Sequence, residues 1–176
     1  MPARFRVEPG SYALVTLHRP SNVDVPDRLA SLVAVLAELA ASVPVLFPVH
    51  PRTRARLEEF GVRVPAGVRL LEPLGYLEFL GLMTDAGVVL TDSGGVQEET
   101  TVLGVPCLTL RPATERPVTV ERGTNRLVRL EPEAIIAAAR AALASPLRDG
   151  SAPRPELWDG RAAERIARVV VETLGS

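Results

Sequence analysis

Short apolar runs alternate along this chain with longer stretches in which apolar residues recur every three or four positions. The first run, residues 12–17, favours a strand, and residues 25–42 follow it with helical spacing and Pro26 at their start. This unit is repeated: further strands are predicted at residues 43–49, 68–73, 87–91, 105–110 and 125–130, and further helices at residues 51–60, 76–86, 94–104 and 131–144. A last amphipathic helix is predicted at residues 161–173, after a proline-containing loop at residues 146–160.

Strands that alternate with helices of this length indicate right-handed crossovers and a parallel sheet covered by helices on both faces. The sequence therefore predicts an α/β fold: a doubly wound, Rossmann-like sheet of about six strands in a three-layer αβα arrangement. We expect a single domain over residues 1–176, because 47% of the residues are hydrophobic and suffice for one buried core. Residues 1–11 are interpreted as a linker or as the cut end of a fragment.

Composition and charge exclude several classes of partner. The net charge is -1 and like charges do not cluster, so we expect no nucleic-acid binding. No stretch resembles a signal peptide, and no apolar segment approaches the ~18 residues of a membrane span. Cys107 is the only cysteine and is interpreted as a small buried thiol. These features predict a soluble, cytoplasmic protein that does not bind a membrane.

Ligands of open parallel sheets bind beyond the carboxyl ends of the strands, and Ser93-Gly94-Gly95 lie at one such end, where a helix is predicted to begin. Glycines allow a ligand to approach the backbone, while free N–H groups and the helix dipole favour an anion such as a phosphate or diphosphate. The alternative is a tight turn that is capped by Ser93 or Asp92.

Two carboxylates, Glu98 and Glu99, follow these glycines by less than two helical turns. Their side chains point about 100° apart, so only one of them is expected to face a ligand. A carboxylate near a diphosphate suits the two hydroxyls of a ribose, which would make the ligand a nucleotide. The alternative is that both are solvated glutamates that stabilise a helix start.

Further charged residues follow two other predicted strands. Arg116 is expected to approach the anion, with Glu115 orienting it, unless the two form a simple ion pair. His18, beside Arg19, could donate a hydrogen bond to a phosphate or move a proton near neutral pH, or have a structural role only.

Taken together, five segments closely resemble the non-hydrolysing UDP-N-acetylglucosamine (UDP-GlcNAc) 2-epimerases. They are VTLHRPSN (15–22), FPVHPRT (47–53), EPLGYLEFLGLM (72–83), TDSGGVQEETTVLGVPCLTLR (91–111) and TERPVTVERGTN (114–125). The resemblance runs from Tyr12 to the C-terminus. It implies one half of a glycosyltransferase-B (GT-B) type architecture, in which two Rossmann-like domains face each other across a cleft. Members interconvert UDP-GlcNAc and UDP-ManNAc by eliminating UDP to give 2-acetamidoglucal and adding it back, without a cofactor or a metal.

The resemblance also implies roles for individual residues. Ser93, Gly94 and Gly95 would hold the diphosphate and Glu99 the ribose, while Arg116 would contact the phosphate or the sugar. His18 would stabilise the departing UDP, Phe79 would lie at the uracil and His50 at a second, regulatory site. Supporting roles fall to Arg19, Asp92, Glu98 and Glu115. The chain departs from many members at Pro20-Ser21, where they have Arg-Glu, and at Leu74, where they have glutamine.

The acid and base carboxylates of the family come from its N-terminal domain, which has no counterpart in this sequence. We therefore expect an isolated chain without epimerase activity, whose partners are UDP, UDP-GlcNAc, the missing Rossmann-like domain and, in the intact protein, a second copy. The missing domain would be either removed from this fragment or encoded separately. Alternatives are a hydrolysing epimerase, a GT-B glycosyltransferase domain, and a non-catalytic UDP-binding module.

Overall fold

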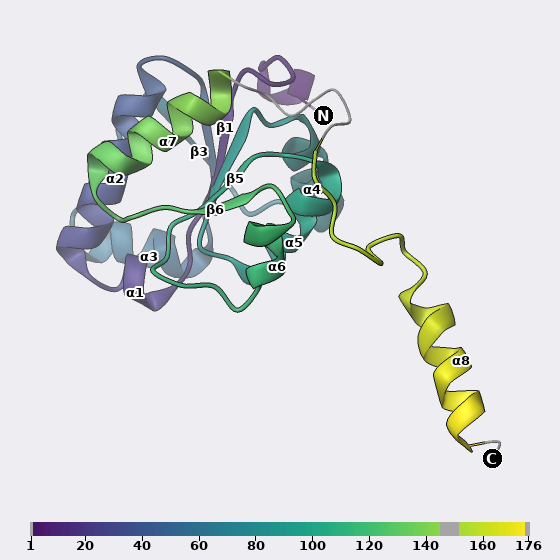
Figure 1. The fold of residues 1–176 in the computed structure, drawn as a ribbon. Helices are drawn as coiled ribbons and strands as arrows, with labels where there is room; N and C mark the ends of the chain where they lie inside the picture. The colour runs from purple at the N-terminus through teal and green to yellow at the C-terminus, as the bar shows by residue number, and fades with distance from the viewer. Residues whose placement is uncertain (1, 145–151, 175–176) are drawn as a thin grey trace.

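The computed structural model describes residues 2–144 and 152–174, and its centre is a six-stranded parallel sheet (Figure 1). The strands are β1 (Ala13–Thr16), β2 (Val45–Pro48), β3 (Val68–Leu71), β4 (Val88–Thr91), β5 (Cys107–Thr109) and β6 (Asn125–Leu127). Their order is β3-β2-β1-β4-β5-β6, so the direction of winding reverses between β1 and β4. The predicted doubly wound, Rossmann-like sheet is confirmed, and a ligand site is expected at this reversal.

Helices cover both faces of the sheet. The helices α2 (Pro26–Ala40), α3 (Pro51–Glu59) and α7 (Pro132–Ala144) pack on one face, and α4 (Tyr76–Asp85) and α5 (Gly94–Leu103) pack on the other. Figure 1 shows α2 and α7 together on one side of the strands and α4 and α5 opposite them. Successive residues of β1 point to different layers, since Leu14 joins the core with α4 while Val15 joins the core with α2.

Local sequence explains where the long helices begin and end. Pro26 occupies the first turn of α2, which then buries Leu29, Leu36 and Leu39 completely or nearly so. Gly104 follows the last residue of α5 and adopts a left-handed conformation with φ 72°, which glycine tolerates better than other residues and which ends the helix. The long predicted helices are therefore confirmed within one or two residues of their ends.

The sequence did not predict three short elements: a 3-10 helix (Pro2–Phe5), α1 (Pro20–Val23) and α6 (Pro117–Glu121). Each has at most five residues and begins with proline, so it is too short to show a periodic pattern. The predicted loop at residues 146–160 lies partly outside the described residues. Its described part, residues 152–160, contains no helix or strand.

The two ends of the chain are placed differently. Near the N-terminus, Val7 is buried and Phe5 packs against the core that contains α4. By contrast, α8 (Ala162–Leu174) projects away from the sheet and its helices (Figure 1) and has no buried residue. Within the described ranges, no helix is both long and apolar enough to cross a membrane.

Candidate functional site

Asp92, directly after β4, joins the ends of the two central strands. Its carboxylate is fully buried and accepts hydrogen bonds from the backbone N–H groups of His18 and Arg19, at 3.0 Å each, and from Asn22 Nδ2 at 3.1 Å. A buried carboxylate with several donors is a stable anchor. Asp92 therefore fixes the loop after β1 at the point where the strand order reverses.

The two histidines of the chain meet beside this anchor. The His18 Nδ1 atom lies 3.3 Å from Asp92 Oδ1, and the ring centroids of His18 and His50 are 5.5 Å apart. Burial lowers the pKa of His18 below its usual value, and the nearby His50 and Arg19 lower it further, while Asp92 opposes this shift. The His18 imidazole is therefore mainly neutral near neutral pH, and an arriving anion would raise its pKa.

The first turn of α5 is open to an approaching ligand. Ser93 is its N-cap, but the hydroxyl makes no capping hydrogen bond. An added Cβ on Gly94 or Gly95 would meet no atom within 4 Å, and neither glycine has a positive φ. Neither packing nor backbone strain therefore explains this glycine pair. A ligand that comes close to the backbone N–H groups does explain it, and those groups favour an anion.

The two carboxylates that follow diverge, as their spacing predicts. Glu98 Oε1 lies 2.9 Å from Arg116 Nε, whereas Glu99 accepts a hydrogen bond from Tyr76 on α4. The pKa of Glu99 is raised, chiefly by burial and also by the neighbouring Glu98. Glu98 therefore forms an ion pair with Arg116, and Glu99 is the carboxylate that does not pair with this arginine.

The Glu115 carboxylate does not pair with Arg116 as predicted, although Arg116 Nη1 donates a hydrogen bond to the backbone carbonyl oxygen of Glu115 at 3.3 Å. Both oxygens of Glu115 accept hydrogen bonds from Arg111, at 2.7 Å each, and this partner lowers the pKa of Glu115 to about 2. The loop after β5 folds back so that residues four apart face each other, whereas Arg116 turns toward α5 and pairs with Glu98. Adjacency in sequence therefore indicated the wrong partner.

Phe79 and His50 border a common hollow of about 170 Å³ at the carboxyl ends of β1 and β2. Phe79 is half-buried and packs against the core beside α4. His50 is the N-cap of α3, where its Nδ1 accepts a hydrogen bond from the backbone N–H of Arg52 at 3.2 Å. The structure brings these two predicted site residues together.

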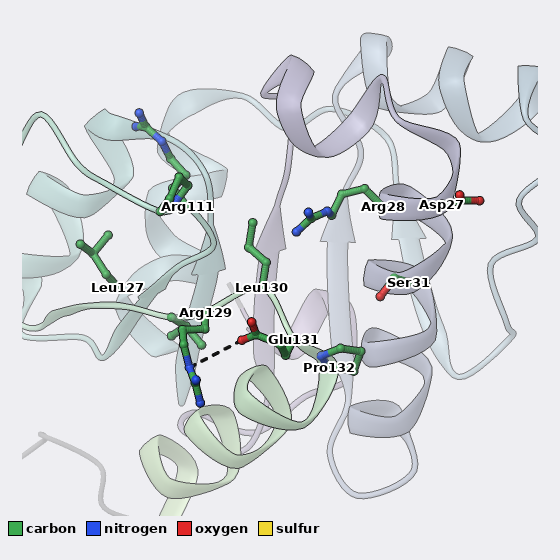
Figure 2. A pocket seen from close by; sticks show the side chains of 11 residues that line it. Asp27, Arg28, Ser31, Arg111, Leu127, Arg129, Leu130, Glu131 and Pro132 are labelled. Atoms are coloured by element: carbon green, nitrogen blue, oxygen red, sulfur yellow. Dashed lines mark ion pairs between the residues drawn. The ribbon is translucent and has the colours of Figure 1, made fainter.

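A larger groove of about 720 Å³ lies beside the site, between α2 and the loops that follow β5 and β6 (Figure 2). Three arginines border it, but Arg111 is held by Glu115 and Arg129 lies 3.6 Å from Glu131. Among the described residues, only Arg28 of these three has no ion-pair partner. We place the anion site at the N-terminus of α5 instead, because the first turn of that helix is open and lined by glycines.

Cys107 is buried, as predicted, and burial raises the pKa of its thiol to about 11. It therefore stays protonated and is not a nucleophile. Across residues 2–144 and 152–174, no three His, Cys, Asp or Glu side chains gather in a way that could hold a metal ion.

Sequence reasoning missed the buried polar residues that support the site. Asn22, Gln97 and Asn125 are almost completely buried, and all three side chains are hydrogen-bonded. Gln97 lies one helical turn after Ser93 and could have been noticed by that spacing. Asn125 carried no such signal, because its partners are distant in sequence.

Comparison with known proteins places the chain beside a family of nucleotide-sugar enzymes. A sequence model of the family described as UDP-N-acetylglucosamine 2-epimerase matches residues 2–171. A UDP-N-acetylglucosamine 2-epimerase of Methanocaldococcus jannaschii is 43% identical over 165 residues, which cover 90% of this chain and 44% of the relative. A UDP-2,3-diacetamido-2,3-dideoxy-D-glucuronate 2-epimerase of Pseudomonas aeruginosa is 40% identical over 163 residues, covering 92% of this chain and 44% of the relative. The chain thus spans about 44% of the length of these curated relatives.

Solved structures agree with this result. The M. jannaschii UDP-GlcNAc 2-epimerase in complex with UDP-GlcNAc and UDP matches with a TM-score of 0.83 at 41% identity, covering 97% of this chain and 48% of that one. The Neisseria meningitidis enzyme bound to UDP-GlcNAc matches with a TM-score of 0.78 at 31% identity, covering 97% of this chain and 47% of that one.

Proposed function

The chain belongs to the UDP-N-acetylglucosamine 2-epimerase family, and on this premise we propose that it is the UDP-binding half of such an enzyme. In this proposal it forms one of two Rossmann-like domains of a GT-B architecture. The observation that carries the proposal is the uncapped, glycine-lined first turn of α5 beside a guanidinium. This combination suits a diphosphate, which needs backbone N–H donors and a positive charge.

Within this site each residue has a distinct role. Gly94 and Gly95 hold the diphosphate through backbone N–H groups. Ser93, whose own N–H donates to Thr91 Oγ1 at 3.0 Å, contributes its hydroxyl. Arg116, positioned by Glu98, neutralises part of the charge. His18, mainly neutral when the site is empty, donates a hydrogen bond to the diphosphate and stabilises UDP as it leaves. These contacts strengthen as negative charge develops on the leaving group.

The nucleoside extends from the diphosphate toward α4. Glu99, which stands apart from Arg116 and near Tyr76, accepts the ribose hydroxyls. Phe79 lies at the uracil, and His50 across the same hollow contributes to a second UDP-GlcNAc site with a regulatory role.

The acid–base steps of epimerisation are assigned to a second domain. In the intact protein the proton at C2 of the sugar is removed and the C1–O bond to UDP breaks, giving 2-acetamidoglucal. UDP then returns, and a proton is added on the opposite face. The carboxylates of the described site are engaged: Asp92 by backbone N–H groups, Glu98 by Arg116, Glu115 by Arg111 and Glu99 by Tyr76. We therefore assign the proton exchange with the sugar to groups outside this site.

The position of α8 supports a missing domain. Five of its large apolar side chains are exposed: Ile166, Val169, Val170, Val171 and Leu174. Its four charged residues lie together on the remaining face. The match to the M. jannaschii structure covers 97% of this chain, and the unmatched part is shorter than α8, so the match includes at least part of this helix. That protein is about twice as long as this chain. We propose that α8 packs against the second domain, and that the intact protein is a homodimer.

Calorimetric titration of the chain with UDP, followed by UDP-GlcNAc, tests the proposal. We expect weak UDP binding and no gain from the added sugar, because the sugar contacts belong to the second domain. Glu99→Ala should weaken UDP binding, whereas Glu133→Ala, on the remote helix α7, should leave it unchanged.

Two results would contradict the proposal. A folded chain that shows no UDP binding at millimolar concentration would remove the site assignment. Much tighter binding of UDP-GlcNAc, or its turnover, would show that this chain supplies sugar contacts that we assign to the other domain.

A further inference from the structure

A fully buried amide connects the two loops of the proposed diphosphate site. Gln97, in the second turn of α5, donates a hydrogen bond from Nε2 to the carbonyl oxygen of Ser93 at 3.1 Å. Its Oε1 accepts hydrogen bonds from Thr114 Oγ1 at 2.5 Å and from Asn125 Nδ2 at 3.1 Å. One side chain therefore holds the start of α5 and the loop before α6 at a fixed separation.

The backbone of Arg116 is held on both sides by threonines. Its N–H donates to Thr114 Oγ1 at 2.9 Å, and its carbonyl oxygen accepts from Thr119 Oγ1 at 2.7 Å. Arg116 has φ -125° and ψ 57°, outside the helical and extended regions, and it precedes a helix of only five residues. The Arg116 carbonyl oxygen also accepts from the backbone N–H of Thr119 at 3.0 Å, so the start of α6 and the two threonine hydroxyls together fix its position.

In this cluster the hydroxyls of Thr114 and Thr119 each accept one hydrogen bond and donate another. Thr114 accepts from Arg116 and donates to Gln97, while Thr119 accepts from Asn125 Nδ2 at 3.1 Å and donates to Arg116. The remaining Asn125 oxygen accepts from Thr109 Oγ1 at 2.7 Å. A partly buried network in which each of these hydrogen bonds joins a donor to an acceptor favours a single arrangement.

We propose that Gln97 is a positioning residue, which acts through Thr114 to place Arg116 against the diphosphate of the bound nucleotide. This inference rests on the proposed UDP site and explains why a polar side chain occupies a buried position on α5. Glu98 holds the end of the Arg116 side chain at 2.9 Å, and the Gln97 network holds its backbone. Both constraints are in place before the ligand arrives, so binding does not have to order the guanidinium.

The experiment removes one hydroxyl and keeps the shape of the side chain. Thr114→Val breaks the connection between Gln97 and Arg116, and Thr114→Ser retains it. UDP and uridine are titrated into each variant of the chain and followed by NMR chemical shifts, with melting temperature as the check of folding. We expect Thr114→Val to weaken UDP binding about fivefold and uridine binding hardly at all, and Thr114→Ser to restore UDP affinity.

A double-mutant cycle shows whether Thr114 acts through Arg116. Arg116→Ala should weaken UDP binding, and Thr114→Val should cost nothing further in its background. Losses that add, or an equal loss for UDP and uridine in Thr114→Val, would overturn the positioning role. Unchanged UDP affinity in Thr114→Val, while Arg116→Ala weakens it, would overturn the inference and leave the proposed function intact. No UDP binding by the unmodified chain would overturn both.

Discussion

At the scale of single residues, two glycines of this chain have different reasons to be glycine. An added Cβ at Gly87, directly before β4, would overlap the carbonyl oxygen of Gly10 and lie 2.8 Å from Leu143 Cδ2. An added Cβ at Gly94 would lie in open space at the proposed diphosphate site. The first glycine is required by packing, and we attribute the second to the ligand.

This contrast predicts opposite effects for the same substitution. Gly87→Ala should lower the free energy of unfolding by about 1–3 kcal/mol, because the backbone of Gly10 cannot move freely. Gly94→Ala should leave stability unchanged and weaken UDP binding about tenfold or more, since the methyl group would occupy the ligand's space. Chemical denaturation and UDP titration of both variants measure the two effects. Normal UDP affinity in Gly94→Ala would show that no ligand approaches this glycine closely.

His18 gives a prediction about pH. Its pKa is lowered in the folded chain by burial, so protonation favours the unfolded state. The free energy of unfolding should therefore fall as the pH drops through about 6.5, the value for an unperturbed histidine, toward the lower pKa of the folded state. NMR titration should give a His18 pKa below 6.5 in the free chain and a higher one in the UDP complex. A pKa that UDP leaves unchanged would separate His18 from the diphosphate.

The sequence indicated chemical types better than partners. Ser93, Gly94 and Gly95 were predicted to open a helix beyond a strand end, and they do. Glu115 was assigned to Arg116, although it pairs with Arg111, because the path of a loop is not visible in a sequence. Gln97 could have been noticed from its spacing to Ser93, but its role could not, since its other partners Thr114 and Asn125 are 17 and 28 residues away.

At the scale of elements, the apolar periodicity of the sequence predicted the long helices, whether or not their apolar faces are buried in this chain. The helices α7 and α8 both have 13 residues and both were predicted from their apolar pattern. Only α7 uses that pattern within this chain, where it packs against α2 and the sheet. The pattern of α8 is equally regular, yet its residues are not buried. Amphipathicity therefore predicts a helix and a buried face, but not the surface that covers this face.

The short helices show the opposite limit. With four and five residues, α1 and α6 are stabilised mainly by contacts from elsewhere in the fold, because one helical turn is not stable alone. Asn22 of α1 reaches Asp92 and the carbonyl oxygen of Leu110, and Thr119 of α6 reaches Asn125. No local pattern could predict them, and they border the candidate site because these contacts hold them there.

At the scale of the whole molecule, the apolar face of α8 is exposed in the part of the chain that the structure describes. A helix that exposes five large apolar side chains favours association with another protein surface. When the second domain is absent, another copy of the chain offers the same apolar face, so α8 should cause self-association. We expect sedimentation to show dimers or larger species that increase with concentration.

Substitutions on the two faces of α8 distinguish this cause from others. Combining Ile166→Glu with Val170→Glu places charges on the apolar face and should give a monomer. Arg168→Glu, on the charged face, changes charge without changing the apolar surface and should leave association intact. Both variants should keep the UDP affinity of the unmodified chain, because α8 projects away from the site (Figure 1). A chain that stays monomeric at high concentration would mean that the face of α8 is too weakly apolar to associate, and it would weaken the argument that α8 packs against a second domain.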